Sequence, residues 1–150
     1  SGRGEIRETL RELRYNTPAD YVHIVRIHNG GGDLKAMLPL YMSCLFEDRD
    51  VSVVPTKSSI QGLELDDHYR EMVRKLLEER DFIAEVATIN DETLQDIYSL
   101  QRAKYTRKVL LRANRDGIYF LRTTSRTAPL DGNANNLQFR KAVSALRKHY

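Results

Sequence analysis

Three consecutive glycines, Gly30 to Gly32, are the first candidates for chemistry in this sequence. Glycine adopts positive φ without strain and lets a ligand approach the backbone closely, so the amide N–H groups of Gly31 and Gly32 could stabilise an oxyanion. No Gly-Lys-Ser/Thr follows, which excludes a phosphate loop, and Lys35 stands where a dinucleotide-binding fingerprint requires its third glycine. A tight turn without chemistry is the alternative interpretation.

The single cysteine, Cys44, and the four scattered histidines lack metal-binding spacing, so we expect no metal and no cofactor.

The pattern around the glycines predicts a βαβ unit that would position these groups. Residues 21–28 are rich in β-branched and aromatic side chains, which favours a strand. Asp33 could cap a helix whose apolar residues recur at helical spacing up to position 45, and residues 51–54 would form a second, parallel strand after a right-handed crossover. We expect a helix over 4–15 and further helices that begin at Asp66 or Asp67, at Asn90 and at Thr106. We also expect a strand over 118–121, a loop over 123–136 and a basic amphipathic helix over 137–150.

Composition indicates one globular domain over residues 1–150. Of these residues, 41% are hydrophobic and 30% are charged, which is typical of globular chains. No apolar run approaches the roughly 20 residues that a membrane-spanning helix needs, so we expect no membrane partner. A single cysteine excludes an internal disulfide and favours a cytoplasmic location.

Positive charge is concentrated in the last third of the chain. The net charge is +3, but residues 101–150 carry 12 Lys and Arg against 2 Asp and Glu, whereas residues 1–100 carry 12 against 19. A basic cluster of this kind could contact the phosphates of a nucleic acid. Its members are Arg102, Lys104, Arg107, Lys108 and Arg112. A solvated face, or one that pairs with the acidic part of the same chain, is the alternative.

The stretch around the glycines resembles the proteolytic subunit of the Clp protease (ClpP) family, within the crotonase-like superfamily. Ile27-His-Asn-Gly-Gly-Gly32 is similar to that family's Ile-Asn-Ser-Pro-Gly-Gly, and Asp50-Val51-Ser52 falls on its Asp-Val-Ser. Met37 and Tyr41 fall on its Met-Ala-Ile-Tyr. A looser similarity extends over residues 5–122.

This resemblance implies an α/β fold of repeated βαβ units around a small parallel sheet, and a serine endopeptidase, a hydrolase with Ser59 as nucleophile. It further implies His68 as the base, or Lys104 or Lys108 in a serine–lysine dyad if burial lowered the pKa of the amine. A loop serine and a surface histidine are the alternative interpretation. Lys57-Ser58-Ser59-Ile60 stands near the family's Gly-x-Ala-Ser-Met-Gly, without its small residues, and the family's aspartate falls near Ala103 or Tyr105. A catalytically degenerate relative that acts as an assembly subunit is therefore the alternative interpretation within this family. The family implies ring-shaped homo-oligomers, with an unfoldase or an active subunit as partner. The alternative function is a nucleic-acid-associated or scaffold protein that uses the basic cluster.

Overall fold

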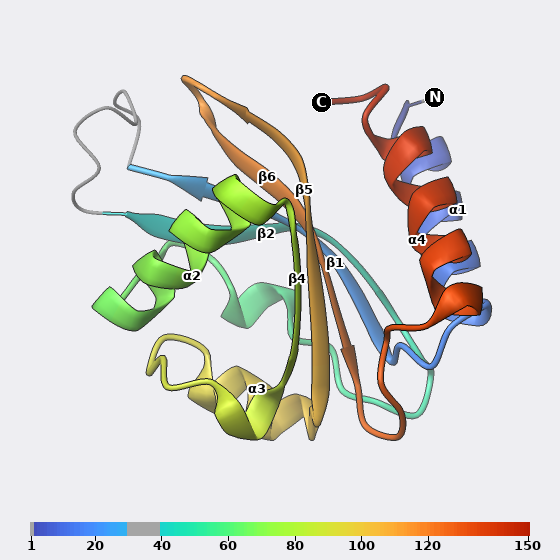
Figure 1. Cartoon of the computed structure of the whole chain (residues 1–150), viewed down its shortest axis with the longest axis horizontal. Helices are drawn as coiled ribbons and strands as arrows, with labels where there is room; N and C mark the ends of the chain where they lie inside the picture. The colour runs from blue at the N-terminus through green and yellow to red at the C-terminus, as the bar shows by residue number, and fades with distance from the viewer. Residues whose placement is uncertain (1, 30–39) are drawn as a thin grey trace.

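A computed structural model describes residues 2–29 and 40–150 as one antiparallel sheet between two pairs of helices (Figure 1). The elements are α1 (Gly2–Tyr15), β1 (Tyr21–His28), β2 (Tyr41–Arg49), η2 (Lys57–Ser59), β3 (Leu63–Glu64), α2 (Asp67–Glu79), β4 (Asp81–Glu85), η3 (Val86–Thr88), α3 (Gln95–Gln101), β5 (Tyr105–Asn114), β6 (Gly117–Ser125) and α4 (Asn133–Leu146). Within the described residues the sheet has six strands in the order β3-β2-β1-β6-β5-β4, and every neighbouring pair is antiparallel. None of the helices in these residues combines the length and the apolar character that crossing a bilayer requires.

The predicted α/β fold of parallel, crotonase-like or ClpP-like βαβ units is wrong. Residues 21–28 do form a strand, β1, but both of its neighbours, β2 and β6, run antiparallel to it. Residues 41–45 belong to β2 rather than to a helix, and residues 51–54 form a turn rather than a second strand. The glycine turn and the start of the predicted helix fall within residues 30–39, which lie outside the described residues.

The errors have a physical reason, because short apolar runs fit both the helical and the strand period. In β2, Met42 and Cys44 are buried while Tyr41, Ser43 and Leu45 are partly exposed, which is the strand period. In β5, the helix predicted from Thr106 is a strand in which Val109 and its neighbours are buried on both faces. A strand covered on both sides reads as a continuous apolar run, as a buried helix does.

Elements with strong local signals were predicted correctly. The strand over 21–28 has the expected bounds, and the helix predicted over 4–15 is α1, which buries its apolar stripe. The carboxylate of Asp66 caps α2 by accepting a hydrogen bond of 2.7 Å from the backbone N–H of Tyr69, as expected for an N-cap. The connection between β6 and α4 spans residues 126–132.

The sheet separates two hydrophobic cores. Val25 and Cys44 pack beneath α2 and α3, whereas Phe46 packs beneath α1 and α4; Figure 1 shows these helix pairs on opposite faces of the sheet. Opposite the middle of β1, the register of β2 shifts by one residue, Leu45. After an extra residue of this kind, every later side chain of the strand points to the opposite face of the sheet from the one it would otherwise take. The bulge therefore turns Glu47 towards α2 and α3, on the same face as Cys44.

Candidate functional site

Four buried polar side chains form one row across the sheet, beneath α2 and α3. Glu47 of β2, His23 of β1, Arg122 of β6 and Lys108 of β5 lie on consecutive strands, and each is the register partner of the next. Directly opposed residues on neighbouring strands point to the same face. The exposed fraction is 1% for His23, 1% for Arg122 and 0% for Lys108. We call these four residues the polar row.

His23 joins the two sides of the polar row as a neutral imidazole. Its Nε2 lies 2.8 Å from Oε2 of Glu47, and its Nδ1 lies 2.8 Å from Nη2 of Arg122. A guanidinium can only donate, so Nδ1 accepts and the proton is on Nε2, which donates to the carboxylate. Burial lowers the pKa of His23 to about 4, against the opposing effect of Glu47. The ring is therefore neutral at pH 7.

The carboxylate of Glu47 extends this network to α3. Burial opposes its ionisation, but hydrogen bonds from His23 and Thr56 hold its pKa below the usual value. The Thr56 hydroxyl donates to Glu47 at 2.7 Å and accepts from Nε2 of Gln101 at 3.1 Å. Gln101 in turn accepts from the Thr124 hydroxyl at 3.2 Å. One chain of hydrogen bonds thus connects β1, β2, α3 and β6.

The two cations of the polar row have no carboxylate at ion-pair distance among the described residues. Besides His23, Arg122 contacts the sulfur of Met42, at 3.7 Å from Nη1, and its Nε has no hydrogen-bond partner among the described residues. The ammonium of Lys108 donates to the Tyr98 hydroxyl at 3.2 Å. The buried hydroxyl of Tyr69 is close enough to Arg122 for the guanidinium to oppose the rise of its pKa, but within the described residues it makes no hydrogen bond of good geometry. Buried charge and unpaired polar groups are both costly in free energy.

Aromatic rings surround the ammonium of Lys108. Its Nζ lies 5.2 Å from the ring centre of Phe82 and 5.5 Å from that of Tyr69, distances at which a cation is attracted to a ring face. Burial and the charge of Arg122 lower the pKa of Lys108 to about 7, although the carboxylate of Asp91 opposes them. Near neutral pH the amine is therefore divided between its charged and neutral forms.

A groove of about 420 Å³ lies at the surface beside Phe82, one of the rings that contact this ammonium. It lies between α2 and the segment that follows β4, and its lining includes Met72, Phe82 and Asp91. Since the Phe82 ring also contacts Lys108, a small molecule in this groove would lie one side chain away from the polar row. Lys108 and Arg122 do not line the groove, so a carboxylate or phosphate in it could pair with them only after the Phe82 side chain moved aside. Among the described residues, no group of three or more His, Cys, Asp and Glu is arranged to hold a metal ion.

The predicted catalytic residues are not joined in the structure. Ser59 ends η2 and His68 lies in the first turn of α2; both are exposed, and no hydrogen bond connects them. Gly31 and Gly32, the predicted oxyanion residues, lie outside the described residues. The antiparallel sheet removes the parallel strands on which the peptidase interpretation depended.

The predicted basic cluster does not form one surface. Consecutive strand residues point to opposite faces, and Arg107 and Lys108 are both buried, on opposite sides of the sheet. Arg112 donates to the backbone carbonyl of Tyr150 at 2.7 Å. Only Arg102, Lys104 and Arg112 of the five are exposed, and the nucleic-acid alternative therefore has no support.

Sequence reasoning missed His23, Glu47 and Arg122 as site residues. The sequence indicated two of them, because each is a polar residue inside an apolar strand. His23 stands in Tyr-Val-His-Ile-Val and Arg122 in Tyr-Phe-Leu-Arg-Thr. A charged or polar side chain in such a position is rarely buried without a partner. The sequence did not indicate Glu47, because the bulge in β2 decides to which face of the sheet its side chain points.

Cys44 is expected to be an unreactive thiol. It is 2% exposed, its Sγ lies 3.2 Å from the carbonyl oxygen of Phe46, and burial raises its pKa to about 12. The thiolate is the reactive form, so a disulfide reagent at pH 8 should label the native chain at least about 100-fold more slowly than the chain in guanidinium chloride. Equal rates in the two conditions would show that Cys44 is accessible.

Comparisons with known proteins identify the fold. No protein-family model matches this chain, and no curated protein matches its sequence. Its structure aligns with the photoproduct state of GAF3 from Slr1393 of Synechocystis sp. PCC6803 at a TM-score of 0.68 and 16% identity, over 98% of this chain and 91% of that one. It aligns with a GAF domain/HD domain protein from Geobacter sulfurreducens at a TM-score of 0.64 and 15% identity, over 99% and 93%. A phycocyanobilin-bound GAF domain from a cyanobacterial phytochrome aligns at a TM-score of 0.57 and 14% identity, over 99% and 93%.

At these identities the likeness shows the fold alone, which is that of a GAF domain. The resemblance to the Clp protease family, and the serine peptidase function drawn from it, are therefore wrong. The similarity around the glycines rested on a few short sequence matches.

Proposed function

We propose that this chain, with the fold of a GAF domain, is a ligand-responsive domain that binds a small anionic molecule through Lys108 and Arg122. The observation that carries the proposal is that both cations are buried, adjacent across β5 and β6, and without a carboxylate partner among the described residues. A bound anion would offset the desolvation of both. One structural neighbour holds phycocyanobilin, which supports the idea that this fold can enclose a small molecule.

The ligand would be a carboxylate or phosphate attached to an apolar body. Its oxygens could accept from Lys108 Nζ and from the unpaired Nε of Arg122, and could also bond the Tyr69 hydroxyl. Charge-assisted hydrogen bonds of this kind are short and strong. The apolar body would contact Met72 and Phe82 in the groove of about 420 Å³, a size common for small-molecule sites.

The response would be transmitted through His23. Arg122 donates to His23, which donates to Glu47, and the chain of hydrogen bonds ends on Gln101 of α3. An anion that draws the guanidinium of Arg122 away from His23 would therefore change the hydrogen bonding at α3. A ligand shifts such an equilibrium only by the difference between its affinities for the two arrangements.

The test is a thermal-shift screen of small carboxylates and phosphates, followed by NMR of the Arg122 Nε–H signal. We expect at least one anion to raise the Tm and move this signal, while its neutral amide or ester does neither. Lys108→Met should weaken binding about tenfold or more, and affinity in the native chain should fall as the pH rises above 7, because Lys108 loses its proton.

Lys104→Met is the matched control, since Lys104 is exposed just before β5. Binding of neutral analogues, unchanged affinity in Lys108→Met, or no binding by either class of anion would contradict the proposal. A cytoplasmic location is part of the proposal, because Cys44 is a free thiol. Self-association and a partner such as an unfoldase or an active subunit stay predictions from the sequence.

A further inference from the structure

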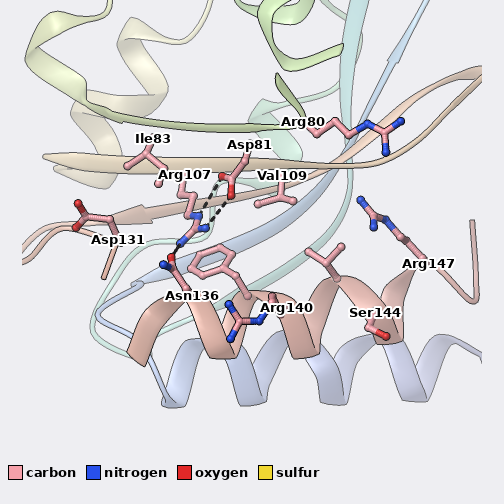
Figure 2. A pocket seen from close by; sticks show the side chains of 12 residues that line it. Arg80, Asp81, Ile83, Arg107, Val109, Asp131, Asn136, Arg140, Ser144 and Arg147 are labelled. Carbon is pink, nitrogen blue, oxygen red and sulfur yellow. Dashed lines mark hydrogen bonds and ion pairs between the residues drawn. The ribbon is translucent and has the colours of Figure 1, made fainter. Parts of the chain in front are cut away.

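A second, larger groove lies on the opposite face of the sheet, between α4 and the edge strand β4 (Figure 2). Its volume is about 960 Å³. The wall formed by α4 consists of residues 136, 139, 140, 143, 144 and 147. Their spacing of three and four places them on one helix face, and at 1.5 Å per residue this face is roughly 16 Å long.

The floor of the groove is apolar and only partly covered. Phe139 and Val143 of α4 meet Val109 of β5 there, and Ile83 of β4 is 45% exposed. On this face α1 packs on β1 and β2, and α4 on β5, while the helix that packs on β4, α2, lies on the other face. The layer of α1 and α4 therefore stops one strand short of the edge of the sheet.

Three arginines, Arg80, Arg140 and Arg147, surround this floor, and none has a carboxylate partner in the part of the chain that the structure describes. The backbone carbonyl of Arg80 accepts from the N–H of Leu110 at 2.9 Å, and Nη2 of Arg147 donates to the carbonyl of Leu110 at 2.9 Å. Both arginines are thus anchored at the same end of the groove, where Figure 2 shows them on facing walls. The side chains of Arg80 and Arg140 make no hydrogen bond or ion pair with residues 2–29 or 40–150.

The acidic residues of the groove do not neutralise these arginines. Asp81 is held by a fourth arginine, Arg107, whose Nε and Nη2 donate to its two carboxylate oxygens at 3.1 and 2.7 Å (Figure 2). Asp131 forms no ion pair with any described residue, and Figure 2 places it at the end away from Arg147. The groove therefore carries net positive charge, from Arg80 and Arg147 at one end and from Arg140 midway along the α4 wall (Figure 2).

We propose that this groove docks an acidic amphipathic helix of a partner protein. A helix of about 11 residues would match the length of the exposed face of α4 and would extend the helix layer over β4. Its apolar stripe would cover Ile83, Val109 and Phe139, and its carboxylates would face the arginines. This is the helix-in-groove mode of recognition, with apolar anchors at i, i+3 or i+4, and i+7. The open side of the groove, at the sheet edge, fits a polypeptide better than an enclosed small molecule.

The experiment is selection of a displayed peptide library on the full chain, followed by affinity measurement with the most enriched synthetic peptide. We expect enrichment of peptides with Leu-type anchors at helical spacing and flanking Glu or Asp. The double variant Arg140→Glu with Arg147→Glu should bind this peptide at least about tenfold more weakly. The matched control is Lys141→Glu with Lys148→Glu, which makes the same charge change at the same spacing on residues outside the groove, and it should bind within about twofold of the native chain.

The single variant Arg140→Glu keeps the test valid if the double variant unfolds, because Arg140 has no side-chain partner among the described residues. It should weaken binding about threefold or more, and higher salt should weaken binding in the native chain. The proposal is overturned if no peptide is enriched, if the enriched peptides are neutral or basic, or if the control variant loses as much affinity. It is also overturned if small carboxylates or phosphates displace the peptide, at equal or lower concentration, from the Lys108→Met variant, in which the anion site of the polar row is disabled.

Discussion

His23→Leu is expected to lower the free energy of unfolding by about 3–5 kcal/mol at pH 7. Among the described residues, the imidazole is the only side chain that bonds both Glu47 and Arg122, through two contacts of 2.8 Å. Leucine fills a similar volume but leaves a buried guanidinium and a buried carboxylate oxygen without this partner. The measurement is urea unfolding of both proteins, with the midpoint and the slope compared. A loss below about 1 kcal/mol would show that His23 is not the link within the polar row.

Two controls separate this effect from a simple change of packing. In a double-mutant cycle, Arg122→Met should cost less in the His23→Leu background than in the native chain, because the two residues contact each other. The native chain should also lose up to roughly 3 kcal/mol between pH 6.5 and 4 through His23. Its folded pKa is about 4, so in this range the unfolded histidine binds a proton that the folded one does not. The His23→Leu variant should lack this component.

Lys108→Met is expected to raise the free energy of unfolding, by about 1–4 kcal/mol at pH 7 in the absence of ligand. The native ammonium is fully buried and is held by one tyrosine hydroxyl, that of Tyr98, and by aromatic rings. Methionine has a similar length and no charge to desolvate. A residue that lowers stability in this way is typical of a binding site, where the missing interaction is supplied by the ligand.

The pH dependence of stability distinguishes the effect of the buried charge from a change in packing. Burial lowers the pKa of Lys108 from 10.5 to about 7, so between these values the unfolded chain binds one more proton than the folded chain. The stability of the native chain therefore rises with pH across this window, and the advantage of Lys108→Met should shrink from pH 7 towards pH 9.5. Lys104→Met, at an exposed position, should show no such trend. A Lys108→Met variant less stable than the native chain across this range would mean that the ammonium has a stabilising role in the fold itself.

The proposed anion site and the proposed groove for a partner helix lie on opposite faces of one sheet. Lys108 of the polar row and Arg107 of the larger groove are consecutive residues of β5. Because strand neighbours point to opposite faces, a shift of β5 on ligand binding would reach both grooves. The order of the two events can be measured, since the peptide affinity of the larger groove should change when an anion occupies the polar row, and thermodynamic coupling must be reciprocal.

Local patterns in the sequence were sufficient to predict α1, β1 and the cap of α2. Each depends on residues within a few positions of one another: the apolar stripe of α1, the β-branched run of 21–28, and Asp66 three residues before Tyr69. Helical periodicity and N-caps are local properties, so no partner segment is needed to detect them.

Only the tertiary structure decided strand direction, the identity of β2 and β5, and the composition of the site. His23 and Arg122 are 99 positions apart, and Glu47 faces them only because Leu45 bulges out of register. A short apolar run can form a helix or a strand, and neighbouring strands that supply hydrogen bonds decide between the two. A buried polar group is stable only where another strand places a hydrogen-bond partner beside it. Those pairings are made across the whole chain, which is why the strands and the polar row could not be predicted from the local sequence.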